Sequence, residues 1–212
     1  AIRRQRQMCI RDKNITADEN FDTFSLSWYN NTDVDPATGL TPYINMQKVL
    51  KVCHDFVDNF DNTFSNLLFI GQTGVGKTFL SNCIARALMD SCHSIIYLTA
   101  GEFFDSFKSD DFKEFGSSKF DTSFFVECDL LIIDDLGTEK ASDYNFSNLF
   151  NTINERLLRR KSIIISSNLE MPDIETRYSQ RIFSRLVSAY SILRLFGDDI
   201  RCMKKLSPTK RS

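Results

Sequence analysis

The residues with the clearest chemical potential form an unbroken Gly-Gln-Thr-Gly-Val-Gly-Lys-Thr run, which fits the phosphate-binding pattern G-x-x-x-x-G-K-[ST]. In such a loop, glycines let successive backbone N–H groups curl around a polyphosphate, and the helix that follows adds a partial positive charge. Lys77 reaches the terminal phosphates and the Thr78 hydroxyl ligates Mg²⁺. We therefore predict a nucleoside triphosphate site made of Gly71, Gln72, Thr73, Gly74, Val75, Gly76, Lys77 and Thr78.

A second motif, the acidic pair Asp134-Asp135, follows the apolar run Leu-Leu-Ile-Ile at 130–133. A buried strand that ends in a carboxylate can hold Mg²⁺, directly or through water, opposite the threonine of the loop. We assign this metal role to Asp134. Asp135 is placed to polarise the attacking water as a general base. The alternative is a core strand followed by an Asp-rich turn.

Three further polar residues are candidates for the same reaction. Asn168 ends the run Ile-Ser-Ser-Asn and is expected to orient the hydrolytic water, unless it only caps a helix or a turn. Arg185 lies four residues after Arg181 on one side of an expected helix, where it either solubilises the surface or acts in trans as an arginine finger. Arg201 follows the last expected strand and is able to reach a phosphate.

The elements that must position these residues alternate along the chain. Near-continuous apolar strands separated by helices predict a parallel sheet that is covered on both faces. We expect strands at 66–70, 94–99, 129–134, 162–167 and 192–196, and helices at 45–60, 77–90, 142–160 and 177–190, with two short helices within 101–127.

Length and composition fit one globular domain with an appended arm. The chain has 212 residues, of which 42% are hydrophobic and 25% charged, and its net charge of −2 provides no overall positive field for nucleic acid. The six cysteines include no C-x-x-C pair, which favours reduced cytosolic thiols over a zinc site. Without a signal peptide or an apolar run long enough for a bilayer, we expect a cytoplasmic protein with no membrane partner.

Taken together, these motifs resemble those of the DnaC/DnaI family of bacterial helicase loaders, which are AAA+ ATPases. The features that carry the resemblance are the phosphate loop, the Leu-Leu-Ile-Ile-Asp-Asp-Leu-Gly-Thr-Glu run at 130–139, Ser-Ser-Asn at 166–168, Arg-Ile-x-Ser-Arg-Leu at 181–186 and Gly-Asp-Asp-Ile-Arg at 197–201. The match extends over roughly residues 45–205. On this resemblance Arg185 is the trans-acting finger, Arg201 is the second sensor, and Arg181 is a weaker candidate for either role.

The resemblance also implies a fold, cofactors and partners. The fold is α/β, a three-layer P-loop NTPase (AAA+/ASCE) with a five-stranded parallel sheet and no separate helical lid domain. We divide the chain into an arm or linker at 1–45, an ATPase domain at 46–205 and a basic tail at 206–212. The cofactors are ATP or ADP with Mg²⁺, and ATP hydrolysis is expected to be weak and to depend on assembly.

Family members place a DnaB-like hexameric replicative helicase on single-stranded DNA and self-associate into a ring or spiral. In this chain the segments that could line the DNA path are 101–127, with Phe104, Phe107 and Lys108, and Lys140 to Tyr144. Aromatic stacking there would provide grip without sequence preference. The competing view is that these Phe residues are core. The chain opens at Ala1, so we expect that an upstream helicase-binding domain is missing.

Three other functions remain open. An IstB-like transposition helper would share nearly all the motifs. A small-molecule or nucleotide kinase would need an Arg-rich lid and an acceptor pocket within one chain. A nucleotide-gated binding module would bind ATP with negligible hydrolysis, and Asp135 keeps this possibility open because many relatives carry Glu at that position.

Overall fold

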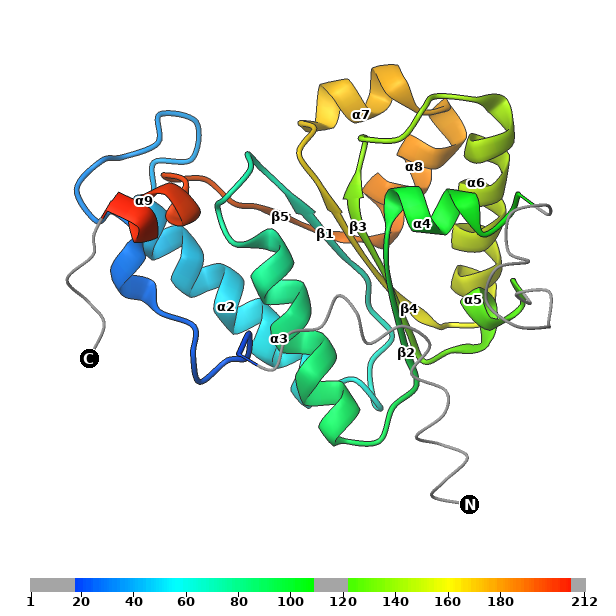
Figure 1. Ribbon diagram of the computed structural model, residues 1–212, viewed down its shortest axis with the longest axis horizontal. Coiled ribbons are helices and arrows are strands. Elements are labelled where there is room, and N and C mark those ends of the chain that lie inside the picture. Colours follow the sequence, from blue (N-terminus) through cyan, green and yellow to red (C-terminus); the bar gives the residue numbers. More distant parts are fainter. Residues whose placement is uncertain (1–17, 109–121, 207–212) are drawn as a thin grey trace.

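The computed structural model describes residues 18–108 and 122–206 (Figure 1). Five strands form one sheet in the order β2-β3-β4-β1-β5, and every neighbouring pair is parallel. The strands are β1 (Leu67–Ile70), β2 (Ile95–Thr99), β3 (Leu130–Leu136), β4 (Ser162–Ser167) and β5 (Ser191–Arg194). The prediction of a five-stranded parallel sheet is confirmed. Because β1 lies between β4 and β5, the loop that follows it opens at the carboxyl edge near the middle of the sheet.

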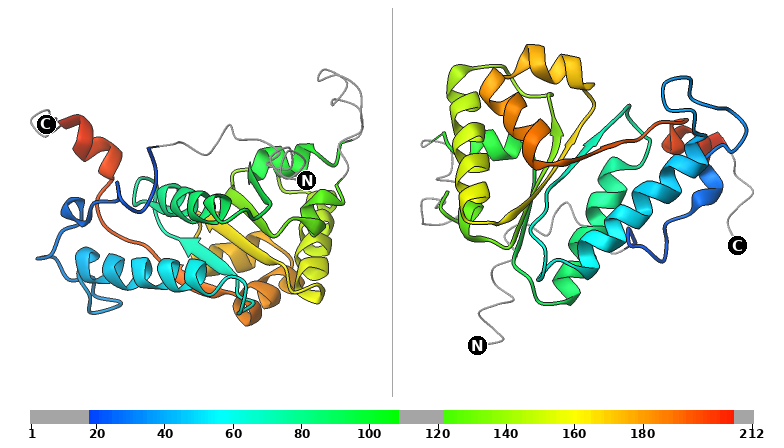
Figure 2. Two further views of the ribbon diagram at one scale, coloured as in Figure 1. Left: turned by 90° about the horizontal axis from the view of Figure 1, so that it is seen from below. Right: turned by 180° about the vertical axis from the view of Figure 1, so that it is seen from behind.

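Helices cover both faces of this sheet, as a parallel sheet with crossover connections requires. Successive residues of β1 show why: Leu67 and Phe69 belong to one buried cluster, and Leu68 and Ile70 to the other. The first cluster is completed by α2 (Pro42–Asp58) and α3 (Lys77–Asp90). The second is completed by α4 (Ala100–Asp105), α5 (Phe124–Glu127), α6 (Asp143–Leu158), α7 (Met171–Arg177) and α8 (Gln180–Ala189). Figure 2 shows these three layers.

Some boundaries differ from the predicted ones for local reasons. Helix α2 begins at Pro42, because Thr41 caps it by accepting a hydrogen bond from the Ile44 N–H and proline is well suited to the first turn. The helix expected at 177–190 begins at Gln180 as α8, and Arg177 is the last residue of a separate helix, α7. Tyr178 and Ser179 are extended between them, and the Ser179 hydroxyl caps α8. Three short elements were not predicted, η1 (Leu26–Trp28), α7 (Met171–Arg177) and α9 (Ile200–Leu206).

The expectation that Phe104 is available for DNA stacking is wrong. Its side chain is 1% exposed and its ring lies 5.1 Å from that of Phe103. Phe103 in turn contacts Phe107 and Phe125 at centroid separations of 5.2 Å. This aromatic cluster is part of the core, because α4 packs directly on β2 and β3 and buries the apolar side of its short helix.

The carboxylate of Asp129 stabilises the amino ends of the strands, opposite to the carboxyl edge where the phosphate loop lies. Asp129 accepts hydrogen bonds from the N–H and hydroxyl of Ser94, at 3.0 and 2.7 Å, and from Lys161 Nζ at 2.8 Å. Burial alone would raise the pKa of Asp129, but the bonds from Lys161 and Ser94 outweigh burial and lower it to about 2. A pKa below the unfolded value means that the ionised group stabilises the fold above about pH 4, and that this contribution is lost as pH falls towards 2.

We expect Asp129→Asn to lower the free energy of unfolding by about 1 kcal/mol at pH 7, since the pair is partly exposed and screened by solvent. The loss should shrink near pH 3. Urea unfolding at the two pH values measures it. Asp105→Asn, which removes an exposed partner of Lys108, should change stability little at either pH. An equal loss at both pH values in Asp129→Asn would contradict the charge argument.

Candidate functional site

The phosphate loop joins β1 to α3 and depends on two glycines for its shape. Gly74 and Gly76 have φ angles of 82° and 106°, which L side chains rarely adopt. A Cβ on Gly74 would lie 2.2 Å from the carboxylate of Asp199, and a Cβ on Gly76 would lie 2.6 Å from the Tyr29 hydroxyl. The loop is therefore held against two segments that are distant in sequence, and neither glycine position has room for a side chain.

Lys77 is the centre of a hydrogen-bond network at the mouth of the loop. Its Nζ donates to the carbonyl oxygens of Gly71 and Gln72, both at 2.7 Å, and to Asn168 Oδ1 at 2.6 Å. The side chain is 5% exposed. Burial lowers the pKa of Lys77, and the nearby carboxylates of Asp135 and Asp134 oppose this shift. A phosphate that enters the loop meets a pre-positioned cation whose water has already been replaced by protein oxygens.

Asn168 connects this cation to the acidic motif. Its Nδ2 donates to Asp135 Oδ1 at 3.3 Å while its Oδ1 accepts from Lys77. Asp135 has a φ of 57°, and its N–H donates to Ser166 Oγ at 2.9 Å where the register of β3 and β4 shifts. This strained backbone turns the Asp135 side chain into the pocket. Burial and the charge of Asp134 raise the pKa of Asp135, against opposing effects of Lys77, Arg201 and Asn168.

Asp134 is buried, and its side chain is not among those that line the nucleotide pocket. One of its carboxylate oxygens accepts from the Tyr97 hydroxyl at 2.9 Å and the other accepts from Ser166 Oγ. The pKa of Tyr97 is raised by burial and by Asp134. Hydroxyl and carboxylate oxygens are the ligands that Mg²⁺ prefers, so Thr78 with this acidic pair fits the ion. With both oxygens engaged, Asp134 suits a water-mediated contact better than a direct one.

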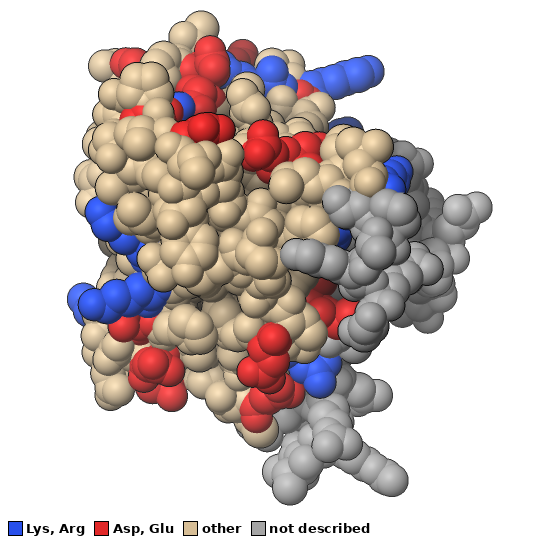
Figure 3. Space-filling model, turned by 90° about the vertical axis from the view of Figure 1, so that its left-hand side faces the viewer, with Lys and Arg blue, Asp and Glu red and all other residues tan. Residues whose placement is uncertain are grey.

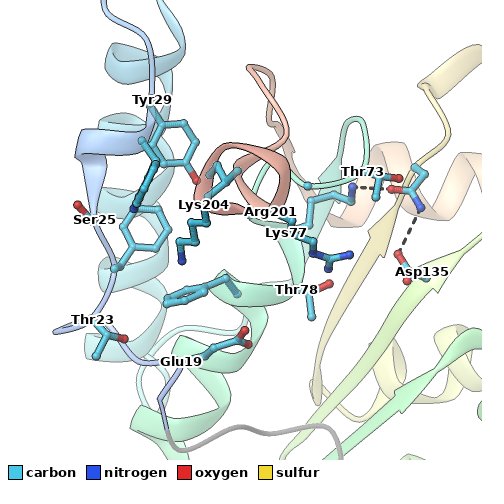
Figure 4. Close-up of a pocket in the computed structure, with 17 residues that line it drawn as sticks. Glu19, Thr23, Ser25, Tyr29, Thr73, Lys77, Thr78, Asp135, Arg201 and Lys204 are labelled. Carbon is cyan, nitrogen blue, oxygen red and sulfur yellow. Dashed lines mark hydrogen bonds between the residues drawn. The ribbon is translucent and has the colours of Figure 1, made fainter. Parts of the chain in front are cut away.

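The pocket extends well beyond the phosphate loop (Figure 4). At one end lie Asp135 and Asn168, in the middle the loop and Arg201, and at the other end a set of aromatic and polar side chains from the N-terminal arm. Those from the arm are Glu19, Thr23, Phe24, Ser25, Trp28 and Tyr29. None of them was predicted, because the arm has no apolar periodicity that would place its side chains.

Aromatic rings make up the end of the pocket that is remote from Lys77. Phe24 lies 5.5 Å from Phe79 and 5.9 Å from Tyr29 between ring centroids, and the Tyr29 hydroxyl donates to the Val75 carbonyl at 3.1 Å. Lys204 Nζ lies 5.8 Å from the Trp28 ring and 5.9 Å from the Phe79 ring. Flat apolar faces beside a polyphosphate loop match the shape and chemistry of a nucleotide base.

The C-terminal helix α9 is attached directly to the phosphate loop. The Ile200 N–H donates to the Gly74 carbonyl at 3.1 Å, and Asp199 Oδ1 accepts from the N–H groups of Arg201 and Cys202 at 2.8 and 3.2 Å. This capped first turn directs Arg201 and Lys204 into the pocket. Arg201 and Lys204 lie one helical turn apart on α9. Arg201 borders the phosphate end of the pocket and Lys204 borders the aromatic end.

Comparison with known proteins decides the family. Residues 42–207 match the family described as IstB-like ATP binding protein. The chain belongs to this family. The replicative helicase loader DnaC of Escherichia coli K12 is 23% identical over 151 residues, which cover 71% of this chain and 61% of that protein. The chain therefore spans less than two thirds of the length of this relative.

Solved structures with the same fold include two proteins of DNA replication. The crystal structure of the DnaC helicase loader superposes with a TM-score of 0.68 at 20% identity, covering 88% of this chain and all of that one. AMPPCP-bound DnaA from Aquifex aeolicus superposes with a TM-score of 0.66 at 18% identity, covering 92% of this chain and 56% of that one. The predicted resemblance to DnaC/DnaI-type AAA+ ATPases, with their ATP-binding fold, is confirmed.

In this member of the IstB-like family, Arg181 and Arg185 do not line the nucleotide pocket. Both are exposed on α8, beside Phe150 of α6, and Arg185 donates to Asn154 Oδ1 at 3.1 Å. Figure 1 shows α8 on the side of the sheet opposite to α3. A role for either arginine in hydrolysis therefore requires a triphosphate that belongs to another copy of the chain.

The segments expected to meet DNA are only partly described, since 109–121 lies outside the described residues. Phe107 is half-buried, whereas Lys108 and Lys140 are exposed, and Tyr144 is 54% exposed with its hydroxyl donating to the Phe107 carbonyl at 2.8 Å. On the face shown in Figure 3, the described basic side chains stand apart among neutral and acidic ones. In the described part of the chain, no helix combines the length and apolarity needed to cross a membrane.

Proposed function

We propose that this chain is the ATP-hydrolysing domain of a helicase loader, which places a hexameric replicative helicase on single-stranded DNA. The observation that carries the proposal is the division of the catalytic set. Lys77, Asp135 and Asn168 meet in one pocket, whereas Arg185 is exposed on the opposite side of the sheet. A site arranged in this way is suited to an assembly in which each protomer completes the site of its neighbour.

The hydrolytic step needs a nucleophile, a base and stabilisation of developing charge. Asp135 is the base that takes a proton from the attacking water, and Asn168 keeps its carboxylate at the phosphate end of the pocket. Lys77 and Arg201 neutralise charge on the phosphate oxygens as the bond to the leaving ADP breaks. Thr78 and, through water, Asp134 would hold Mg²⁺, which would supply positive charge to the phosphate end of the pocket.

The partners follow from the same proposal. The similar curated protein is a replicative helicase loader, and we infer a DnaB-like helicase as the partner of this chain. Single-stranded DNA would pass near Lys108, Lys140 and Tyr144, which are exposed in neighbouring segments. Two lysines and one aromatic ring provide only modest affinity for DNA, without sequence preference. High affinity therefore requires that this surface be repeated in a ring or spiral of protomers.

The test is ATP turnover measured against protein concentration, with and without single-stranded DNA and helicase. For the wild type we expect turnover per protomer to rise steeply with concentration. Arg185→Ala should bind ATP with unchanged affinity but lose this rise, about 10³-fold at saturation, because its target lies in the adjacent protomer. Arg159→Ala, which removes an exposed arginine paired with Glu155 on α6, is the matched control and should behave like wild type.

Two outcomes would contradict the proposal. Retained hydrolysis by Arg185→Ala at high concentration would exclude the trans role. Turnover that is first-order in enzyme and requires a small phosphate acceptor would favour the kinase. The transposition helper shares the pocket and the family, so loading of a helicase hexamer onto circular single-stranded DNA, which only the loader supports, separates the two.

A further inference from the structure

Glu19 introduces a negative charge into a pocket that otherwise suits a polyanion. Its half-buried side chain lines the same cavity as Lys77 and Arg201. In Figure 4 its carboxylate points inward on the side of Thr78, away from Tyr29 and Lys204. A carboxylate at this place repels the phosphates and suits a neutral hydrogen-bond donor of the ligand.

The protein holds this carboxylate in a defined position. Asn82 Nδ2 donates to Glu19 Oε2, and Asn82 is 1% exposed on α3, one helical turn beyond Thr78. Within residues 18–108 and 122–206, Glu19 Oε1 has no recorded hydrogen-bond partner. One oxygen is therefore anchored by a buried amide while the other is free to accept a hydrogen bond in the pocket.

The order of groups along the pocket identifies the part of the ligand beside Glu19. Phosphates lie at the loop, and the flat base is matched by the Phe24 and Trp28 rings five and nine residues further along the same arm. The sugar joins these two ends of a nucleotide, and Glu19 belongs to the wall of the same pocket on the side of Thr78. Ribose hydroxyls are neutral donors, and an Asp or Glu carboxylate is the acceptor that dinucleotide sites use for them.

We propose that Glu19 accepts a hydrogen bond from the ribose 2′-hydroxyl and makes the site selective for ribonucleotides over 2′-deoxyribonucleotides. The inference rests on the proposed nucleotide-binding function. Asn82 is a positioning residue in this scheme, since it contacts Glu19 and orients the carboxylate.

The test compares the affinities of ATP and 2′-deoxy-ATP, measured by calorimetry with the full chain. The wild type should prefer ATP about tenfold, the size expected for one hydrogen bond to a charged acceptor. In Glu19→Ala the ratio should fall to about one, through weaker ATP binding and unchanged or tighter 2′-deoxy-ATP binding. Asp22→Ala, which removes an exposed carboxylate of the same arm, is the control and should keep the wild-type ratio.

Each other outcome has a distinct meaning. An equal loss of affinity for both nucleotides in Glu19→Ala would overturn the inference and favour a metal or structural role. Loss of discrimination between ATP and ITP, with the ATP to 2′-deoxy-ATP ratio intact, would overturn it in favour of the base amino group. If the wild-type chain bound neither nucleotide, the proposed function itself would fail. Thermal unfolding of the ligand-free variants confirms that they fold.

Discussion

Replacement of Lys77 by alanine should weaken ATP binding at least about 100-fold, since two or more charge-assisted bonds to phosphate are lost. The three donors of the buried ammonium are used by Gly71, Gln72 and Asn168, so a phosphate replaces at least one of these acceptors while the cation stays in place. Burial also lowers the pKa of Lys77, which indicates that its charge is costly in the empty pocket. Without ligand, the free energy of unfolding of the variant should therefore lie at most about 1 kcal/mol below that of the wild type.

Calorimetric titration with ATP and thermal unfolding measure the two parts of this prediction. Lys51→Ala, an exposed lysine on α2, is the matched control and should leave both unchanged. ATP affinity within a few-fold of wild type in Lys77→Ala would show that the triphosphate does not occupy the loop. A large loss of stability without ATP would instead show that the lysine is mainly structural.

Asp135→Asn should separate hydrolysis from binding. The amide keeps the size of the side chain and its contact with Asn168, so we expect ATP affinity within about threefold of wild type. Turnover should fall about 10²–10³-fold, because the amide cannot accept the proton of the attacking water. Rapid-quench hydrolysis at saturating ATP measures the loss. Asp173→Asn, an exposed carboxylate in the first turn of α7, should hydrolyse ATP normally.

The pH profile adds a second readout for Asp135. Burial and Asp134 raise its pKa above the usual value, and a base acts only when ionised. Wild-type turnover should therefore decline on acidification at a higher pH than an ordinary aspartate would cause, and the residual activity of Asp135→Asn should lack this limb. Equal turnover in wild type and variant would instead favour the nucleotide-gated binding module.

The elements that could be predicted are those with a local sequence pattern, such as an apolar run followed by a motif. Four apolar residues before a glycine-rich loop specify β1 and its site, and the same holds for β3 with Asp134 and Asp135 at its end. The helix boundaries near Ser179 depend on capping by a single hydroxyl, which periodicity does not show. Helix α9 has no buried residue and is fixed by its contact with the phosphate loop, so it was not predictable from an apolar face.

The site was predictable where a residue type implies its chemistry, and not where chemistry depends on packing. Lys77 and Asn168 were chosen from separate motifs, and only the fold brings them to 2.6 Å. The engagement of Asp134 by Tyr97 could not be inferred, since the tyrosine belongs to a neighbouring strand with no polar motif. The aromatic end of the pocket is formed largely by residues 24–29, whose partners in the phosphate loop and α3 are 46 or more residues away in sequence.

The contacts of Tyr29 and of the Asp199–Ile200 segment with the phosphate loop have a consequence for synthesis of the protein. Tyr29, which packs against Gly76, is made before the loop, whereas the Asp199–Ile200 segment that bonds to Gly74 is made after all five strands of the sheet. Strand β1 also waits for β4 and β5, its two later neighbours. During translation the loop therefore lacks part of its supporting contacts until Ile200 has left the ribosome. Nascent chains and truncated products that end before Asp199 should therefore compete poorly for ATP.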